Sequence, residues 1–364
     1  MNRKTTNVAV FISCHGFGHA ARISAVMQAL SSRHNHLHFH LFTQIPDWFF
    51  ANTGISISYH PVQADIGFVQ RDALHIDLPG TLSALRTFLP FDNVKLEQVQ
   101  NKLGELNCEA VLCDISTFGI SVAKKMGIPS ILMENFTWEW IYANMNCYSE
   151  FAGFIPYLGD ISQSADIHIQ LKPFCEESAT AIAVNPVARK PIQTTADLRD
   201  QLGLSIHRKI VMLSMGGTPH RMEFLTQLSK RWPEIDFIIS GHDDSYPERN
   251  LRVLPGNSGL DHPSLVVLAD LVIAKLGYST LAETYWSGKP TAVFTRPNYP
   301  EMPPLEQFLH DHMHGVVLNE SGVDSDGWIN RVDQLIDLPI VDRAEEVRGE
   351  EQCAEIIAAA LGWS

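Results

Sequence analysis

The sequence predicts an α/β protein made of two doubly wound units, each a parallel sheet covered by helices on both faces, that face each other across a cleft. Short apolar runs alternate with helical patterns along the whole chain. These runs are apolar at consecutive positions, as expected for strands buried on both faces. The order of strand, glycine turn and helix occurs near residue 15 and again near residue 215, so the second half repeats the outline of the first.

In the first half, the apolar run 8–13 leads into CHGFGHAAR, and a helical pattern follows through Ile23, Val26 and Leu30. Further strands are expected at 36–42, 55–60, 110–113 and 130–133, with a helix that ends near Met126. The stretch 184–195 carries two prolines and little periodicity, which is typical of a linker.

In the second half, strands are expected at 209–214, 236–240, 251–254, 271–274, 291–294 and 315–318. A helix is expected from about 223 to 231, and a closing helix at 344–361. We therefore predict an N-terminal domain at residues 1–187, a C-terminal domain at 188–345 and a closing segment at 346–364 that packs back on the first domain. Open parallel sheets bind ligands at the carboxyl ends of their strands, so the cleft is the expected site.

The composition limits the kinds of partner. With 364 residues, 45% of them apolar, the chain can bury a large core. Its net charge of −14 disfavours nucleic acid and anionic membranes, and no apolar stretch reaches the length of a membrane span, so no stable membrane insertion is expected. Six cysteines without a CxxC pair indicate reduced thiols in a cytoplasmic protein. The oligomeric state is left open.

The segment AKLGYSTLAETYWSGKP is the most informative junction, because an apolar run meets a glycine turn and then a new helix. The unpaired N–H groups at the start of a helix suit a diphosphate, and Gly277 lets a ligand approach the backbone. Glu283, one turn into the helix, is suited to accept hydrogen bonds from a ribose. The alternative is that Thr280 and Glu283 form a capping box without binding a ligand.

Several motifs also carry a family resemblance. HGFGHAAR, VQRDALHID, NFTWEWIY, MGGTPHR and AKLGYSTLAE resemble the glycosyltransferase-like N-terminal region of plant L-arabinokinases. More distantly, GFGH and LGYSTLAETYWSGKP are similar to GT-B glycosyltransferases, including MurG-like enzymes and UDP-glycosyltransferases. The resemblance implies two Rossmann-like domains, with an acceptor held by the first and a nucleotide sugar, UDP-linked in many relatives, held by the second. The kinase half of the arabinokinases has no counterpart here.

In the first domain, the resemblance implies that His19 is the base that deprotonates the acceptor hydroxyl and that Asp114 orients it. An imidazole titrates near neutral pH, and a carboxylate on its other nitrogen fixes the tautomer. The structural alternatives are that His19 is a helix-start residue packed on glycines and that Asp114 caps the end of a strand. His15 is a rival base at the same turn. Acceptor contacts are expected from residues near these turns, namely Gly16, Gly18, Asn135, Trp138 and Glu139, although the two last are also candidates for the core.

In the second domain, the resemblance implies that backbone amides at the glycine turns hold the donor diphosphate and that Glu283 holds the ribose. The donor-binding residues are expected to be Gly216, Gly217, Thr218, Gly277, Tyr278, Ser279, Thr280, Glu283, Arg296 and Glu301. Where related chains place an Asp/Glu–Gln pair to hold the donor sugar, this chain has TRPNYPE, and Glu301 is the nearest match. Aimed N–H groups stabilise a departing diphosphate without a metal ion.

The sequence thus predicts a metal-independent glycosyltransferase that moves a sugar from a nucleotide diphosphate to a hydroxyl acceptor and needs no cofactor beyond this co-substrate. A second hypothesis is a nucleotide-sugar 2-epimerase or hydrolase on the same fold. A third is a non-catalytic module that binds nucleotide sugars. The donor sugar, the base, the acceptor and the stereochemical course stay open at this point.

Overall fold

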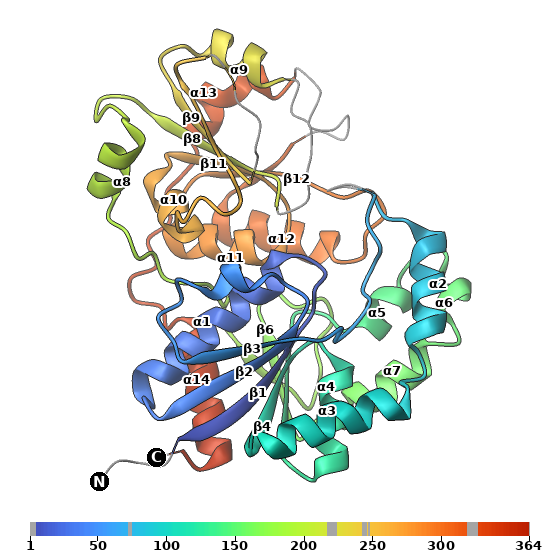
Figure 1. The fold of residues 1–364 in the computed structure, drawn as a ribbon. Helices are drawn as coiled ribbons and strands as arrows, with labels where there is room; N and C mark the ends of the chain where they lie inside the picture. Colours follow the sequence, from blue (N-terminus) through green and yellow to red (C-terminus); the bar gives the residue numbers. More distant parts are fainter. Residues whose placement is uncertain are drawn as a thin grey trace.

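The computed structural model describes residues 5–71, 75–216, 224–241, 246, 248–318 and 327–363. The predicted fold class is confirmed, because the described residues form two parallel sheets, each with helices on both faces (Figure 1). The lower half of the view holds the first sheet, and the upper half holds the second.

The first sheet has the strand order β3-β2-β1-β4-β5-β6-β7 in the described residues, and all of its pairs are parallel. Strand β1 lies inside the sheet, where its Val10 pairs with Leu41 of β2 on one side and with Leu112 of β4 on the other. The strands are β1 Thr6–Ile12, β2 Leu37–Thr43, β3 Ile57–Pro61, β4 Cys108–Asp114, β5 Ser130–Glu134, β6 Ile167–Leu171 and β7 Ile182–Val184.

Two hydrophobic layers cover the first sheet. One contains α1 and the C-terminal helix α14, and the other is built mainly by α2 to α5 and α7. The helical elements are α1 Phe17–Arg33, η1 Asp47–Phe50, α2 Leu78–Phe88, α3 Asn93–Glu105, α4 Thr117–Met126, α5 Trp138–Ala143, α6 Tyr148–Phe151, α7 Ile155–Ser162 and α14 Gly349–Leu361.

The second sheet has the order β10-β9-β8-β11-β12-β13 over the described residues, again with parallel pairs only. Its strands are β8 Ile210–Ser214, β9 Asp236–Ser240, β10 Leu251–Leu254, β11 Leu271–Lys275, β12 Thr291–Phe294 and β13 Val316–Val317. Its helical elements are α8 Thr195–Leu202, α9 Leu225–Arg231, α10 His262–Leu268, α11 Tyr278–Ser287, α12 Met302–Met313, η2 Ile329–Arg331 and α13 Val332–Ile336.

Helix α11 connects the two halves through apolar packing. Its Tyr278 and Ala282 join the hydrophobic layer that contains α1, whereas Leu281 and Tyr285 join the layer on the opposite face of the first sheet. The start of α11 is therefore held against the first domain, directly beside the cleft.

The C-terminal helix α14 lies along α1, as Figure 1 shows in red beside blue. Its Cys353, Ala354 and Ile357 are buried in the same layer as α1, and its first residue, Gly349, lies so close to the Asn185 carbonyl that an added Cβ would be 1.9 Å from the oxygen. The chain thus returns from the second domain to the first. The proposed boundaries at 187 and 345 stay predictions.

The sequence interpretation missed β6 and β7. The segment IHIQL alternates polar and apolar residues, and the three-residue β7 exposes Ile182 and Ala183, so neither has the continuous apolar run that marked the other strands. In β2, His40 is only 5% exposed, and its Nδ1 lies 3.2 Å from Nε2 of His60 in β3.

Candidate active site in the interdomain cleft

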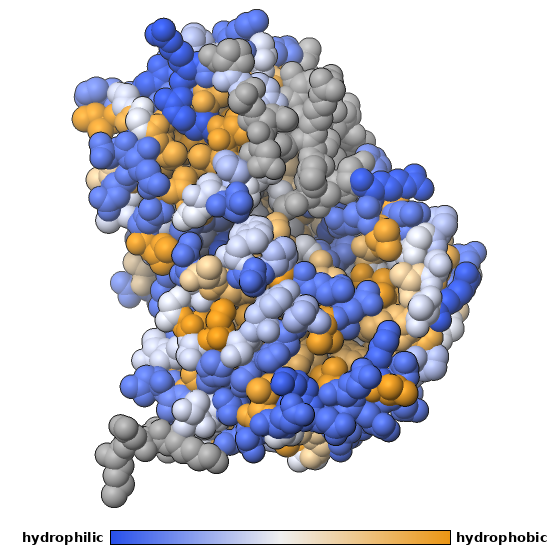
Figure 2. Space-filling view, viewed as in Figure 1, coloured by the Kyte–Doolittle hydropathy of each residue, from blue (hydrophilic) through white to orange (hydrophobic). Residues whose placement is uncertain are grey.

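A cavity of about 540 Å³ lies between the two domains. Residues from the ends of β1, β8, β9, β10, β11 and β12 line it, so both sheets point their carboxyl ends at the same space. The predicted site residues that line it are His15, Gly16, Gly18, His19, Asn135, Gly216, Gly277, Tyr278, Ser279, Thr280, Glu283, Arg296 and Glu301. Figure 2 shows a largely hydrophilic face around the junction of the domains, with only small hydrophobic patches.

Helices α1 and α11 both begin at this cavity, and no side chain caps either start. The N-cap of α1 is Gly16, whose φ of 121° favours glycine, and the N-cap of α11 is Gly277. The alternative that Thr280 and Glu283 form a capping box is wrong, because α11 begins two residues before Thr280 and Glu283 bonds elsewhere. The first amides of both helices thus keep their capacity to bind an anion.

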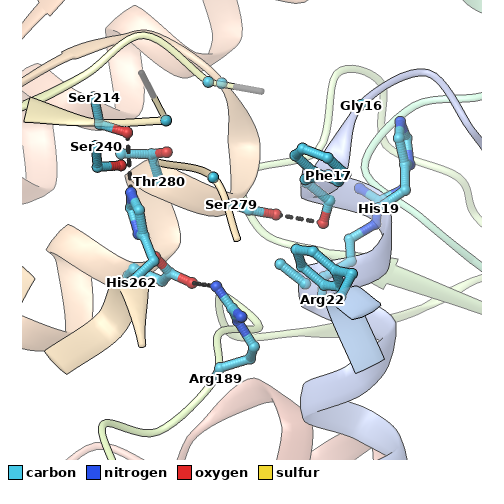
Figure 3. A pocket seen from close by; sticks show the side chains of 18 of the residues that line it. Gly16, Phe17, His19, Arg22, Arg189, Ser214, Ser240, His262, Ser279 and Thr280 are labelled. Carbon is cyan, nitrogen blue, oxygen red and sulfur yellow. Dashed lines mark hydrogen bonds and ion pairs between the residues drawn. The ribbon is translucent and has the colours of Figure 1, made fainter. Parts of the chain in front are cut away.

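The two helix starts also contact each other across the cleft. Ser279 Oγ donates a hydrogen bond of 2.7 Å to the carbonyl of Gly18, and Figure 3 shows Ser279 pointing toward the start of α1. An added Cβ on Gly18 would lie 3.3 Å from the Ser279 oxygen, so a larger residue would fit here only if Ser279 moved by a few tenths of an ångström. The contact fixes the position of α11 relative to α1.

His19 and Asp114 form the predicted pair. His19 Nδ1 lies 2.7 Å from Asp114 Oδ1, and both residues are buried. Burial raises the pKa of Asp114, but the neighbouring Arg22 and His19 outweigh burial and bring it below the usual value. With Nδ1–H donated to the carboxylate, Nε2 of His19 keeps its lone pair for a proton.

Arg22 shares the same carboxylate. Its Nε and Nη2 donate to Asp114 over 2.5 and 2.9 Å, and the side chain is only 2% exposed. Arg22 also donates to the side-chain oxygen of Asn135, and its guanidinium lies 5.2 Å from the centre of the Tyr278 ring in the second domain. Arg22 therefore holds together the dyad, the end of β5 and the start of α11.

A buried polar chain continues from Arg22 into the second domain. Asn135 Nδ2 donates to Glu301 Oε1 over 2.9 Å, and Arg296 Nη2 donates to Glu301 Oε2 over 3.3 Å. Asn135, Arg296 and Glu301 are all less than 9% exposed. Glu301 thus bridges the domains instead of standing alone at the cavity wall.

Glu283 lines the cavity from α11, and both of its carboxylate oxygens have partners. Arg189 from the interdomain segment donates to one oxygen over 3.1 Å, and His262 Nδ1 lies 2.5 Å from the other. Ser214 Oγ is 2.9 Å from His262 Nε2, so a chain of hydrogen bonds joins β8, α10 and α11 (Figure 3). Burial raises the pKa of Glu283, but His262 and Arg189 outweigh burial and bring the pKa below its usual value, so the group stays anionic.

His15 has no carboxylate partner in the described part of the chain. Its Nδ1 lies 3.1 Å from the Phe68 carbonyl oxygen and its Nε2 lies 3.4 Å from Gln70 Nε2. Burial, followed by the charges of Arg296, His19 and Lys275, brings its pKa well below the usual value. His15 is therefore a neutral side chain at the cavity.

Other predicted residues lie behind the cavity wall. Trp138 is buried, donates its indole N–H to Asp65 over 2.9 Å and packs edge-on against His15, whereas Glu139 packs near Gly159 of α7. Neither lines the cavity, so their role in binding an acceptor stays a prediction without a direct contact. Tyr278 covers the turn, because its hydroxyl accepts the Val187 N–H.

Gly216, with a φ of 81°, lies two residues after the end of β8 and lines the cavity, whereas Gly217 and Thr218 fall outside the described residues. In the portion of the chain that the structure describes, no three His, Cys, Asp or Glu side chains are arranged to hold a metal ion. All six cysteines are free thiols. No described helix is long and apolar enough to cross a membrane.

The sequence interpretation missed three residues of this site: Arg22, Arg189 and His262. Arg22 lies one turn after His19, so its position on the same helix face was a signal that went unused. Arg189 and His262 have no local pattern, because the fold brings them to Glu283 from 94 and 21 residues away.

The two domains and the shared cleft define the GT-B glycosyltransferase fold, and solved structures of this class match nearly the whole chain. A glycosyltransferase of kitacinnamycin covers 98% of the chain and 99% of its own, with a TM-score of 0.66 and 14% identity. A UDP-glucosyltransferase from Polygonum tinctorium covers 100% of both chains, with a TM-score of 0.65 and 12% identity. MurG of Acinetobacter baumannii covers 97% and 99%, with a TM-score of 0.57 and 14% identity.

In sequence, the chain is a homologue of the L-arabinokinase of Arabidopsis thaliana, to which it is 26% identical over 345 residues. The match covers 91% of this chain and 32% of the relative, so the chain spans about a third of the length of the curated relative it matches. No protein-family model matches the chain. These findings confirm the predicted resemblance and the GT-B fold.

Proposed function

We propose that this protein is a metal-independent glycosyltransferase that moves a sugar from a nucleotide diphosphate, UDP being the leading candidate, to a hydroxyl acceptor. One observation carries the proposal. The His19–Asp114 dyad and the uncapped start of α11 line or border the same cavity from opposite domains. A base and an anion-binding helix terminus on opposite sides of one space are what transfer from a diphosphate requires.

In this proposal, the amides of residues 278–280 hold the diphosphate, and their N–H groups stabilise the charge that builds as the sugar–phosphate bond breaks. Glu283, held in place by His262 and Arg189, accepts hydrogen bonds from the ribose hydroxyls. His19 Nε2 takes the proton from the acceptor hydroxyl. Asp114 and Arg22 keep the imidazole in the required tautomer and orientation.

A second candidate is a nucleotide-sugar-binding module without transfer activity, and Arg22 favours it. Arg22 Nη2 lies 3.0 Å from His19 Nδ1 and 2.9 Å from Asp114 Oδ1, so the carboxylate that orients His19 is shared with a buried arginine. Such sharing also suits a structural role for His19 in a module that only binds its ligand.

Calorimetry with UDP, followed by assays of donor consumption with and without an acceptor panel, tests the proposal. We expect wild-type protein to bind UDP and Glu283→Gln to bind it about 10-fold or more weakly, because a hydrogen bond to a charged group contributes about 1.5–3 kcal/mol. Glu97→Gln, an exposed position on α3, is the matched control and should bind normally.

His19→Ala separates the candidates. Under the transferase proposal, this variant binds UDP but loses acceptor-dependent turnover, whereas His310→Ala, whose side chain is 82% exposed, keeps it. Sugar release or epimerisation without an acceptor would favour a hydrolase or 2-epimerase. Binding without turnover in the wild type would favour the non-catalytic module, and the absence of any nucleotide binding would refute the donor site.

A further inference from the structure

An arginine that is almost fully buried lines the end of the cavity next to β12. Arg296 follows β12, lines the cavity and is nevertheless only 8% exposed. Its guanidinium lies flat over Tyr299, with 3.7 Å between the guanidinium carbon and the ring centre. Stacking and burial fix its orientation, so its hydrogen-bonding groups point in set directions.

At this end of the cavity, two buried hydrogen-bond donors have no acceptor among the described residues. Each carboxylate oxygen of Glu301 already accepts one bond, from Asn135 and from Arg296. By contrast, the buried Nε of Arg296 and the buried hydroxyl of Tyr299 have no hydrogen-bond partner among the described residues. Buried N–H and O–H groups without partners cost free energy, so a ligand that fills this space gains by supplying acceptors.

The charges here point the same way. Lys275, at the end of β11, lines the same cavity, and its Nζ lies 3.2 Å from the position that a Cβ on Gly216 would occupy. Arg296 and Lys275 are both close enough to His15 to lower its pKa, after the larger effect of burial. Two cations, Arg296 and Lys275, and one carboxylate, Glu301, thus line this part of the cavity in a chain whose net charge is −14.

We propose that the sugar of the donor carries a carboxylate, as in a hexuronic acid, and that Arg296 binds this carboxylate with support from Tyr299. The inference rests on the proposed function and names the substrate class of the same site. A neutral hexose presents hydroxyls, which need acceptors as well as donors, whereas a carboxylate presents acceptors only and matches the groups left over. A rigid guanidinium fork is the side chain best suited to that group.

Titration calorimetry of the wild-type protein with UDP, UDP-glucose and UDP-glucuronate tests the proposal without any substitution. We expect UDP-glucuronate to bind at least 10-fold more tightly than UDP-glucose. If the protein binds UDP but binds UDP-glucuronate no more tightly than UDP-glucose, this inference alone is overturned. Failure to bind any of the three probes overturns the donor site itself, and with it this inference.

Substitutions then test whether Arg296 is the residue that binds the carboxylate. In Arg296→Gln, the ratio of the affinities for UDP-glucuronate and UDP-glucose should fall to about 1, while the affinity for UDP should change by less than about 3-fold. Arg296→Lys should keep part of the preference for UDP-glucuronate. Lys190→Gln removes a charge from a more exposed residue of the same cavity and should leave the preference intact. If Arg296→Gln weakens UDP as much as UDP-glucuronate, Arg296 binds the diphosphate and the proposal is wrong. If the variant does not fold, the wild-type comparison decides.

Discussion

Replacing Asp114 by asparagine removes one buried negative charge and almost no volume. Asp114 is fully buried and accepts from Arg22 Nε, Arg22 Nη2 and His19 Nδ1 over 2.5, 2.9 and 2.7 Å. An asparagine keeps one acceptor oxygen and turns an NH₂ group toward the remaining donors. Arg22 then loses its counter-charge at a position that is 2% exposed, and breaking such a pair costs about 3–5 kcal/mol.

The same substitution should also disable the proposed base. An asparagine NH₂ that faces His19 makes Nδ1 an acceptor and leaves the proton on Nε2, where the acceptor hydroxyl would have to be deprotonated. Loss of general base catalysis reduces turnover by about 10²–10⁴-fold. UDP affinity should change by less than about 3-fold, because the dyad is not part of the proposed diphosphate site.

Urea unfolding measures the stability, and steady-state turnover measures the activity. Glu105→Gln, which loses an exposed pair with Lys102, is the control and should cost less than about 1 kcal/mol. Since the pKa of Asp114 lies below its unfolded value of 3.8, its stabilisation is complete above that value and is lost only as the pH falls through the folded pKa. The difference between variant and wild type should therefore be constant from pH 5 to 8. A folded Asp114→Asn protein with unchanged turnover would refute the role of the dyad.

Two further predictions concern stability away from the chemistry. Burial, with His38, His60 and Lys102 nearby, brings the pKa of His40 to about 4 from 6.5, so its stabilisation is complete above pH 6.5 and is lost as the pH falls toward 4 and below. Between pH 6.5 and 4, the free energy of unfolding measured with urea should change by up to about 1.4 kcal/mol per pH unit. His40→Gln should remove this pH dependence, and the exposed control His310→Gln should keep it. An unchanged pH dependence in His40→Gln would assign the effect to other groups. Gly67→Ala should destabilise the protein by about 1–3 kcal/mol, because φ is +59° and the new Cβ would lie 2.7 Å from the Trp138 ring. Gly104→Ala, in the open on α3, should be neutral or stabilising in the same thermal or urea assay, and equal effects of the two substitutions would contradict the argument.

The fold was predictable because each central strand is a continuous apolar run that ends in a local signal. Val8 to Ile12 leads into a glycine turn, and Leu271 to Ala274 leads into Gly277, so periodicity and turn chemistry agree. Strand β7 carries no such signal, because its pairing with β6 depends on tertiary contacts rather than on its own three residues. Asp114 was predictable for a similar reason, since it closes a buried strand.

The partners of these residues were not predictable in the same way. A helix residue such as Arg22 normally stays solvated, and although its place one turn after His19 pointed toward Asp114, no local pattern shows that Asn135 will also contact it. The same holds for Glu283, whose local pattern resembles a capping box although the fold supplies Arg189 and His262. For Trp138, the sequence pattern fits two roles, because an aromatic residue near a strand end can bind a sugar or pack in the core. In the structure it contacts Asp65 and His15.

Three arginine–carboxylate pairs are concentrated at one cavity: Arg22–Asp114, Arg189–Glu283 and Arg296–Glu301. Buried ion pairs contribute little net stability, because the cost of desolvation offsets most of their attraction. Their concentration in one place is therefore better explained by function. In each pair, the arginine holds a carboxylate that is needed in a fixed orientation, and the pairs that involve Asp114 and Glu301 are joined through Asn135. A ligand and an acceptor bound as proposed, at Arg296 and at His19, would both contact this continuous network, so we expect the two proposed half-sites to be coupled energetically.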